Sequence, residues 1–118
     1  MARIAFVTDS ASDLDPSVAQ SHGIRVVPLA VTFGDETFRA GVDLSTEEFW
    51  ARMTAPEAPF PKTAAASPGD FKAIYDGLFA EGADAIVSVH VAGTLSGAIN
   101  SAAIARDLLA DREIHVVD

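Results

Sequence analysis

The sequence "AIVSVHVAGTLSGAINSAAIARDLLADREIHVV", residues 85–117, decides the fold. Its first six residues, 85–90, are rich in β-branched side chains and predict a strand. Small and apolar residues from Thr94 to about Leu109 predict a helix with Thr94 as its N-cap, and the apolar run at 114–117 predicts a second strand. A strand, a helix and a strand in this order form a βαβ unit, which joins parallel strands. We therefore expect an α/β fold with a parallel or mixed sheet and flanking helices.

Caps, turns and glycines place the elements that precede this unit. Asp15, Ser45 and Ser67 each stand where a helix N-cap is expected, and Glu48 completes a capping box with Ser45. The expected elements are a strand at 4–7, a helix at 16–22, a strand at 24–33 that turns at Gly34–Asp35 into a hairpin, a helix after Ser45, a proline-rich extended connection and a helix at 68–79. We expect the closing strand at 114–117 to be central in the sheet, so either the natural chain is longer or a partner layer lies elsewhere.

Length and composition narrow the function classes. A chain of 118 residues is long enough for one domain with a core, and 17 acidic against 8 basic residues give a net charge of −9. This charge repels phosphate backbones and anionic membrane surfaces, so we expect no nucleic acid partner. The chain has no cysteine, which excludes disulfides, cysteine-ligated metals and thiol catalysis. Asp9, Asp13 and Asp15 lack the rest of a calcium loop and are interpreted as turn and cap residues, so we expect no metal and no cofactor.

Neither apolar stretch of the sequence predicts a targeting or membrane segment. The run at 4–7 is too short for the apolar region of a signal peptide. The uncharged run at 85–105 has the length of a membrane span, but it carries serine, histidine, threonine and asparagine side chains in its middle. We therefore expect a cytoplasmic protein without stable membrane insertion.

Two loops lie where an open parallel sheet binds ligands, beyond the carboxyl ends of its strands. The first is Thr8-Asp9-Ser10, after the first strand, and the second is Gly93–Gly97, before the last helix. In the second loop Gly93 allows a sharp turn and Gly97 allows a close approach, while the Ser96 hydroxyl joins the free amides of a helix N-terminus. These groups suit a carboxylate or a phosphate.

A purely structural interpretation of the same residues stays open. Thr94 can be an N-cap only, and Gly93 a turn only. The loop has neither the Gly-x-Ser-x-Gly pattern of a nucleophile elbow nor the lysine of a P-loop. Thr63, in the stiff proline-rich connection, can present a hydroxyl to a cleft, and His90 is the one histidine that we place at a strand end near Ser96.

Four stretches, taken in order, resemble the amino-terminal part of the DegV family. They are "VTDSASDLDPSVAQSHGIRVVPLAVTFGDETFRAGVDLSTEEFW" at 7–50, "PKTAAASPGDF" at 61–71, "GTLSGAINSA" at 93–102 and "VVD" at 116–118, so the resemblance covers essentially the whole chain. It implies a bacterial protein of two domains that binds a long-chain fatty acid, with the acyl chain in an apolar tunnel. It also implies a partner, a fatty acid kinase that converts the presented acid to acyl phosphate.

The resemblance further implies which residues hold the acid. The candidates for its carboxylate are Thr63, Ser96 and Gly97, with Ser10, Thr94 and His90 as further ones. Two departures from the family remove polar groups, since Ala64–Ala66 stands in place of a Ser-Gln-Pro segment and Ala98 in place of a threonine. The family's carboxyl-terminal domain has no counterpart here, and we interpret residues 1–118 as one amino-terminal α/β domain.

Three functions remain as hypotheses. The first, which we favour, is a fatty acid carrier without catalytic activity of its own, because an apolar chain with one anionic end needs an apolar cavity and a few donors. Apolar residues of the final βαβ unit and of the helix at 68–79 are candidates for that cavity. The second is a serine hydrolase that uses Ser96, with His90 as its partner. The third is a module that binds a phosphate ligand at Thr94–Gly97.

Overall fold

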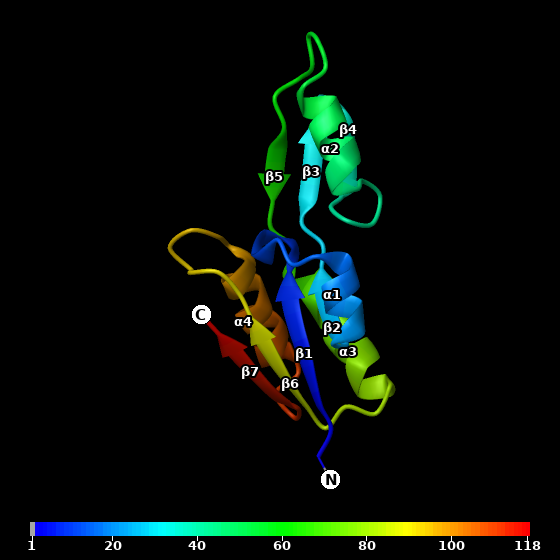
Figure 1. The fold of residues 1–118 in the computed structure, drawn as a ribbon. Coiled ribbons are helices and arrows are strands. Elements are labelled where there is room, and N and C mark those ends of the chain that lie inside the picture. Colours follow the sequence, from blue (N-terminus) through cyan, green and yellow to red (C-terminus); the bar gives the residue numbers. More distant parts are fainter. Residues whose placement is uncertain (1) are drawn as a thin grey trace.

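A parallel sheet forms the body of the molecule (Figure 1). The computed structural model describes residues 2–118. Four strands, β1 (Ile4–Asp9), β2 (Ile24–Val27), β6 (Ala85–Val89) and β7 (Glu113–Val117), pair in the order β2-β1-β6-β7, and every pair is parallel. The predicted α/β fold is therefore confirmed. Among the described residues β7 lies at the edge of the sheet, whereas the sequence predicted a central position for it.

Two helices cover one face of this sheet and enclose the main core. Phe71 and Tyr75 of α3 (Pro68–Ala80) and Ala102 of α4 (Ala98–Leu108) pack against Val7 and Ile86 of the sheet, and all five side chains are buried. The short helix α1 (Pro16–Ser21) lies beside β2 (Figure 1). None of the helices within residues 2–118 has both the length and the apolar character needed to cross a membrane.

The helix starts predicted at Asp15, Ser45 and Ser67 are confirmed. Each of these side chains accepts a hydrogen bond from a backbone amide in the first turn of its helix. Ser45 and Ser67 form complete capping boxes, in which an acidic side chain of the first turn also accepts a bond from the cap residue's own amide. These local bonds fix where α1, α2 (Thr46–Met53) and α3 begin.

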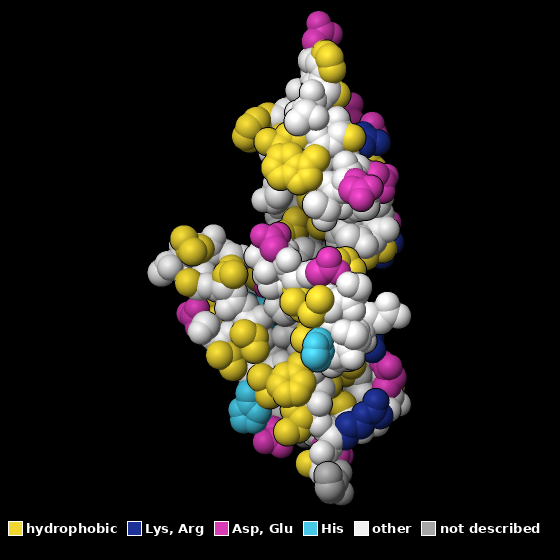
Figure 2. Space-filling view, in the orientation of Figure 1, with side chains coloured by type: hydrophobic (Ala, Val, Ile, Leu, Met, Phe, Trp, Pro, Cys, Tyr) yellow, Lys and Arg dark blue, Asp and Glu magenta, His cyan; other side chains and the backbone are white. Residues whose placement is uncertain are grey.

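The opposite face of the parallel sheet carries exposed apolar side chains. Ile4, Phe6, Val89 and Val117 all point to this side and are 43–50% exposed. We call this surface the open face; in the space-filling view, apolar side chains gather over the strands there (Figure 2). Sheets of parallel strands are ordinarily covered on both faces, so an exposed apolar face is unusual.

A second, smaller unit projects from the carboxyl end of the parallel sheet (Figure 1). In this arm, residues 30–64, strands β3 (Ala30–Phe33), β4 (Glu36–Arg39) and β5 (Lys62–Ala64) form an antiparallel sheet in the order β4-β3-β5. Its own cluster of buried residues is Val31, Phe33 and Leu44, with Phe49 of α2 packed against it. The arm gives the molecule its elongated shape, with extents of 54 × 28 × 22 Å.

The single strand predicted at 24–33 is wrong, because the chain forms two strands there. β2 ends at Val27, and β3 begins at Ala30 in the other sheet. Pro28 has no backbone N–H to continue a ladder, which explains the break. The predicted hairpin is confirmed, since β3 and β4 pair around Gly34 and Asp35. The proline-rich connection, predicted to be extended, turns at residues 54–57 and contains no helix from there to Ser67. It also supplies β5, which pairs with β3.

The predicted start of the last helix is also wrong. α4 begins at Ala98 with Gly97 as its N-cap, and Thr94 lies in a turn before it. The amide of Ala98 donates a hydrogen bond to Ser96 Oγ at 3.2 Å. Ser96, and not Thr94, therefore provides the side-chain oxygen that accepts a hydrogen bond from the first amide of α4. The loop from Val91 to Gly97 lies outside the helix.

Candidate ligand-binding site

A pocket of about 220 Å³ lies between the body of the molecule and the base of the arm. It takes residues from the end of β1, from β5 with the segment after it, and from the loop before α4. The residues that line it are Asp9, Ala11, Leu29, Thr63, Ala64, Ala65, Ala66, Val91, Leu95, Ser96 and Ala98. Thr63 and Ser96, which lie far apart in the sequence, thus face the same cavity beyond the carboxyl ends of the parallel strands, where such folds bind ligands.

Ser96 has a hydroxyl that is well placed to donate to a ligand. The side chain is partly buried, and its oxygen already accepts the hydrogen bond from the Ala98 amide. A serine hydroxyl carries one hydrogen, and in Ser96 this hydrogen is left for another acceptor. A carboxylate oxygen in the pocket can serve as that acceptor.

Thr63 reaches the pocket from the arm. It lies in β5 opposite Val31 of β3, and its side chain is exposed. The next three residues, Ala64–Ala66, also line the pocket and present methyl groups there. The wall on this side therefore offers one hydroxyl and an otherwise apolar surface.

The glycines of the loop differ in how much space surrounds them. A Cβ atom added to Gly93 would lie 3.1 Å from Ile99 Cγ2, which is tighter than ordinary van der Waals contact. A Cβ atom added to Gly97 would meet only Ala65 Cβ, at 4.0 Å. Close packing within the chain therefore explains a glycine at position 93 better than at position 97, and Gly97 serves as the N-cap of α4.

Ser10 and Thr94 do not line the pocket. Ser10 Oγ accepts a hydrogen bond from the amide of Leu29 at 3.2 Å, which ties the first loop to the segment between β2 and β3. Thr94 lies exposed in the turn before α4. Both are next to pocket residues in the chain, because Asp9 and Ala11 flank Ser10 and Leu95 follows Thr94.

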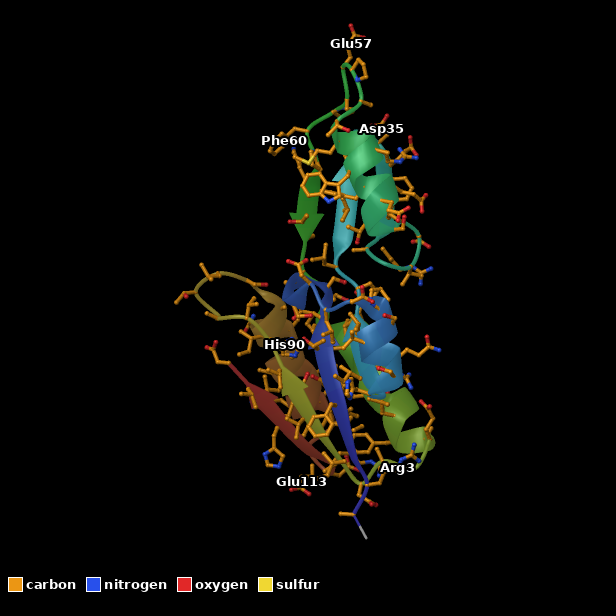
Figure 3. All side chains as sticks on the ribbon, viewed as in Figure 1. Arg3, Asp35, Glu57, Phe60, His90 and Glu113 are labelled. Atoms are coloured by element: carbon orange, nitrogen blue, oxygen red, sulfur yellow. The ribbon has the colours of Figure 1, made fainter. Side chains whose placement is uncertain are left out.

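A buried chain of hydrogen bonds starts at the pocket wall and runs into the core. Asp9 Oδ2 lies 2.5 Å from His90 Nδ1, His90 Nε2 lies 2.6 Å from Ser88 Oγ, and Tyr75 donates its hydroxyl to Ser88 Oγ at 2.7 Å. The second oxygen of Asp9, Oδ1, accepts a bond from the amide of Ala11 at 2.8 Å. All four side chains of the chain are buried, and it connects β1, β6 and α3. His90 lies at the carboxyl end of the sheet (Figure 3).

When His90 is neutral, each of the three hydrogen bonds between these side chains has one donor and one acceptor. Nδ1–H then donates to Asp9, the Ser88 hydroxyl donates to Nε2, and Tyr75 donates to Ser88. Burial raises the pKa of the Tyr75 hydroxyl above its ordinary value, whereas the bond to Ser88 and the guanidinium of Arg106 lower it. Tyr75 therefore stays protonated as the donor at the end of the chain.

The position of His90 bears on the hydrolase hypothesis. Both of its ring nitrogens are engaged, one by Asp9 and the other by Ser88. A general base must be within hydrogen-bond reach of the hydroxyl that it deprotonates. In this arrangement His90 is within hydrogen-bond reach of the hydroxyl of Ser88, which is fully buried, and is not hydrogen-bonded to Ser96. The geometry therefore does not support Ser96 and His90 as a nucleophile and its base.

Most of the buried chain was not predicted from the sequence. Asp9 was interpreted as a turn residue, and its bond to the Ala11 amide supports that interpretation. Its place in the pocket wall and its bond to His90 were not predicted. The sequence contains a signal for one part of the chain, because Ser88 and His90 are two residues apart in an apolar strand and therefore face the same side. The structure adds that β1, which ends in Asp9, is the neighbouring strand. Polar side chains on a core-facing side need partners.

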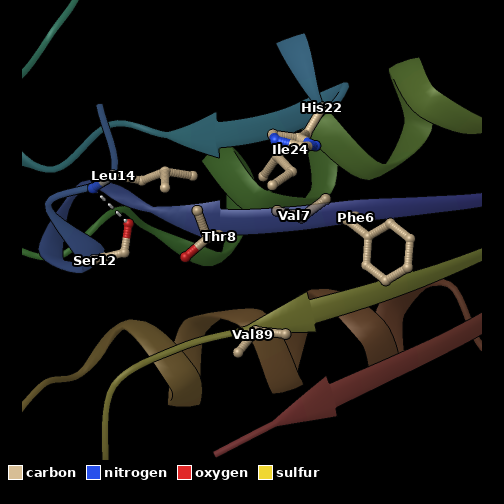
Figure 4. A pocket seen from close by; sticks show the side chains of 8 residues that line it. All are labelled: Phe6, Val7, Thr8, Ser12, Leu14, His22, Ile24 and Val89. Carbon is tan, nitrogen blue, oxygen red and sulfur yellow. Dashed lines mark hydrogen bonds between the residues drawn. The ribbon is translucent and has the colours of Figure 1, made fainter. Parts of the chain in front are cut away.

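A second hollow, of about 450 Å³, lies on the open face (Figure 4). Apolar side chains line most of it, including Phe6, Leu14, Ile24 and Val89. Phe71 and Tyr75, by contrast, pack in the main core on the other face. No side chain of the helix at 68–79 lines either of these two hollows, because its apolar face packs in the main core.

Within residues 2–118 there is no group of three or more histidine, aspartate or glutamate side chains arranged to hold a metal ion. The pocket between Thr63 and Ser96 has hydroxyls, one buried carboxylate and methyl groups, which suit a small polar head group with an apolar tail.

Comparisons with known proteins place this geometry in a family context. A family model described as uncharacterised protein, DegV family, matches residues 3–118. A DegV domain-containing protein of Caldanaerobacter subterraneus subsp. tengcongensis is 35% identical over 118 residues, which are all of this chain and 41% of the relative.

Two solved structures share the fold. A DegV family protein from Thermus thermophilus, whose structure is described under the words fatty acid binding, has 37% sequence identity and a TM-score of 0.84, covering 98% of this chain and 40% of that one. A stearic acid-binding protein from Eubacterium ventriosum has 31% identity and a TM-score of 0.82, covering 100% of this chain and 41% of that one. The chain thus spans about two fifths of the length of the relatives that it matches.

Proposed function

The chain belongs to the DegV family, and on that premise we propose that it binds a long-chain fatty acid whose carboxylate lies in the pocket between Thr63 and Ser96. The observation that carries this proposal is the convergence of the two hydroxyls on one pocket beyond the parallel strands. Relatives of similar fold are described as fatty acid binding and stearic acid-binding proteins, which supports the choice of ligand.

The size and lining of the pocket favour the head group of the acid as its occupant. Sites that enclose a drug-sized ligand have volumes of about 300–1,000 Å³. The pocket here, about 220 Å³, is smaller, so the acyl chain is proposed to extend out of it. Burial of each methylene group contributes about 0.8 kcal/mol, so the tail supplies most of the affinity while Thr63 and Ser96 orient the head group.

We further propose that the chain is one α/β domain of a longer protein, in the amino-terminal position. The share of each relative that it covers, about two fifths, supports this proposal. The exposed apolar side chains of the open face favour it too, because further polypeptide could cover them as parallel sheets require. Carriage of the acid to a fatty acid kinase, in the cytoplasm of a bacterium, is the proposed use of the bound ligand, and it rests on the family resemblance.

The proposal is tested by a titration that separates the head group from the tail. The delipidated protein is titrated with a long-chain fatty acid and with the alcohol of equal chain length. We expect the acid to bind more tightly, and we expect Ser96→Ala and Thr63→Val to reduce this preference. Equal affinity of the unmodified protein for acid and alcohol would contradict a carboxylate site at these hydroxyls.

Two further experiments test the phosphate-binding module and the serine hydrolase. Inorganic phosphate is added as a competitor, and a phosphate-binding module predicts that phosphate binds while the fatty acid does not. A serine-directed phosphonate is the probe for a hydrolase. We expect it to leave Ser96 unmodified under conditions that label a control hydrolase, because His90 is engaged with Ser88.

A further inference from the structure

One part of the pocket lining is joined to the buried chain of hydrogen bonds. It consists of Asp9, Ala11 and Leu29, which we call the Asp9 wall. Asp9 ends β1, Ala11 belongs to the short 3₁₀ helix η1 (Ser10–Ser12), and Leu29 lies between β2 and β3. Only the first of these residues belongs to a strand of the parallel sheet, so the other two need bonds of their own to keep their places.

Hydrogen bonds connect the residues of the Asp9 wall in series. Asp9 is the N-cap of η1, and its Oδ1 accepts the amide of Ala11 at 2.8 Å. Ser10 Oγ, also in η1, accepts the amide of Leu29 at 3.2 Å. The carbonyl of Leu29 accepts the amide of Ala40 at 2.9 Å, which links the wall to the arm. The carboxylate of Asp9 therefore stands at the start of this series of bonds.

The carboxylate of Asp9 is itself held by His90. Its second oxygen, Oδ2, accepts a hydrogen bond from Nδ1–H of the ring, because a carboxylate can only accept. The other ring nitrogen of His90 is hydrogen-bonded to Ser88, and the ring makes an edge contact with Phe71, with ring centroids 5.2 Å apart. The backbone amide of His90 donates to the carbonyl of Val117 at 3.0 Å. His90 thus anchors Asp9 to the sheet and the main core.

We propose that His90 is a positioning residue for the ligand-binding pocket and that it acts through Asp9. This inference rests on the proposed function. The ring of His90 is fully buried and does not line the pocket, so it does not touch the ligand. Its bond keeps the Asp9 carboxylate turned into the protein, and Asp9 in turn holds η1 and Leu29 in place. Binding sites depend on such supporting bonds to keep their lining residues in position.

The orientation of Asp9 matters because the proposed ligand is an anion. Both oxygens of Asp9 bond to donors of the protein, and its side chain is only 4% exposed. Without the bond from His90, Oδ2 loses its donor, which costs free energy unless the carboxylate turns toward water in the pocket. A carboxylate that turns this way comes closer to the carboxylate of the ligand and repels it. An uncharged alcohol of equal chain length escapes this repulsion, so the defect is specific to the acid.

Two substitutions of His90 separate its bond to Asp9 from its place in the core. His90→Asn keeps an N–H donor on the atom next to Cγ, where Nδ1 lies, and loses the group that reaches Ser88. His90→Gln places its amide one bond further out, toward Ser88, and loses the donor to Asp9. Each variant removes the ring and one of the two polar contacts, so the two are matched in what they remove from the core. His115→Gln, which changes an exposed histidine beside Glu113, is the control for a histidine-to-glutamine change.

The measurement is the preference of each delipidated protein for a long-chain fatty acid over the alcohol of equal chain length, with the free energy of unfolding measured alongside. We expect His90→Gln to reduce this preference by about tenfold, because the repulsion by Asp9 acts on the acid alone. We expect His90→Asn to keep most of the preference and His115→Gln to keep all of it. A merely structural role of His90 predicts instead that both His90 variants bind acid and alcohol more weakly by the same factor.

Ser10→Ala tests the later part of the series without altering the buried chain. Ser10 is partly buried and does not line the pocket, and its hydroxyl oxygen holds the amide of Leu29. We expect faster hydrogen exchange of the Leu29 amide and weaker binding of acid and alcohol by a similar factor, because Leu29 is an apolar part of the wall. Asp9 keeps its bond to His90 in this variant, so the preference for the acid is expected to remain.

The outcomes distinguish the two proposals. An unmodified protein that binds no fatty acid contradicts the proposed function. If the unmodified protein binds the acid and His90→Gln keeps its full preference, or if both His90 variants lose the preference equally, the inference is overturned and the proposed function stands. A preference lost in His90→Gln and kept in His90→Asn supports the inference. If either His90 variant does not fold, Ser10→Ala decides, since unchanged binding of acid and alcohol overturns the inference and a joint loss supports it.

Discussion

At the scale of single residues, Ser96 links the start of α4 to the pocket. Its oxygen accepts the Ala98 amide, and its hydrogen remains for a ligand. The Ser96 hydroxyl therefore makes one structural hydrogen bond, to the Ala98 amide, and is proposed to make a second one to the ligand. A mutation of Ser96 affects both bonds, so its effects on stability and on binding have to be measured separately.

Ser96→Ala is expected to weaken binding of the fatty acid by about 1–3 kcal/mol, because a hydrogen bond to a charged group is lost. The measurement is the dissociation constant of the acid, with the free energy of unfolding measured alongside. Ser101→Ala is the matched control, since Ser101 lies on α4, the helix whose first amide bonds to Ser96, and does not line the pocket. If the variant binds the acid as tightly as the unmodified protein does, Ser96 is not part of the site.

Tyr75→Phe is expected to destabilise the protein at neutral pH and to destabilise it less at alkaline pH. At pH 7 it loses the bond to Ser88, which lowers the free energy of unfolding by about 1 kcal/mol. Above pH 10 the unfolded tyrosine ionises while the buried one, whose pKa is raised from 10.0, holds its proton. The unmodified protein therefore loses stability as pH rises through this range, and the phenylalanine variant loses less.

Chemical denaturation at pH 7 and at several values above pH 10 measures this difference. A variant whose stability falls as steeply as that of the unmodified protein above pH 10 would show that Tyr75 is not the group responsible.

Residues of the site differ in how far the sequence could predict them. Thr63 and Ser96 were named from the family resemblance, and the loop of Ser96 also from glycine and hydroxyl spacing; the structure places both on one pocket, while their part in binding stays a prediction. Asp9 could not be assigned in the same way, because its partner His90 is 81 positions away. The pairing depends on the register between β1 and β6, which no local pattern states.

At the scale of elements, helix starts were predictable where the cap is local. A capping box involves residues three apart, so Ser45 and Ser67 could be identified directly. The start of α4 was not predicted correctly. Gly97 is its N-cap and makes no side-chain cap bond, whereas Thr94 is a residue type that commonly caps helices but lies in the turn before this one. The break between β2 and β3 was missed because an apolar run that continues across a proline looks like one strand.

The two capping boxes are expected to stabilise different parts of the molecule. Ser67→Ala and Ser45→Ala should each remove about 1 kcal/mol from the helix concerned. α3 belongs to the main core, so Ser67→Ala should lower the free energy of global unfolding. α2 packs only on the small cluster of the arm, so Ser45→Ala should mainly increase hydrogen exchange of amides in residues 30–64.

Hydrogen exchange measured by mass spectrometry, together with chemical denaturation, separates these effects. If Ser45→Ala instead lowers global stability as much as Ser67→Ala does, the arm and the body unfold as one cooperative unit.

At the scale of the whole molecule, the parallel sheet positions the site and the arm completes it. The ends of β1 and β6 bring Asp9 and His90 together, and the arm brings Thr63 opposite Ser96. The βαβ unit at 85–117 could be predicted because its hydrophobic pattern and glycines agree. The separate antiparallel sheet could be predicted only in its hairpin, because the pairing of β3 with β5 joins distant segments.

Native mass spectrometry after incubation with a long-chain fatty acid, followed by extraction of the bound molecule, tests fatty acid binding at this pocket most directly. We expect one acid per chain in the unmodified protein and much lower occupancy in the double variant Thr63→Val and Ser96→Ala. An unmodified protein that carries no acid, or a double variant that carries as much acid as the unmodified protein, would contradict a fatty acid carboxylate held by Thr63 and Ser96.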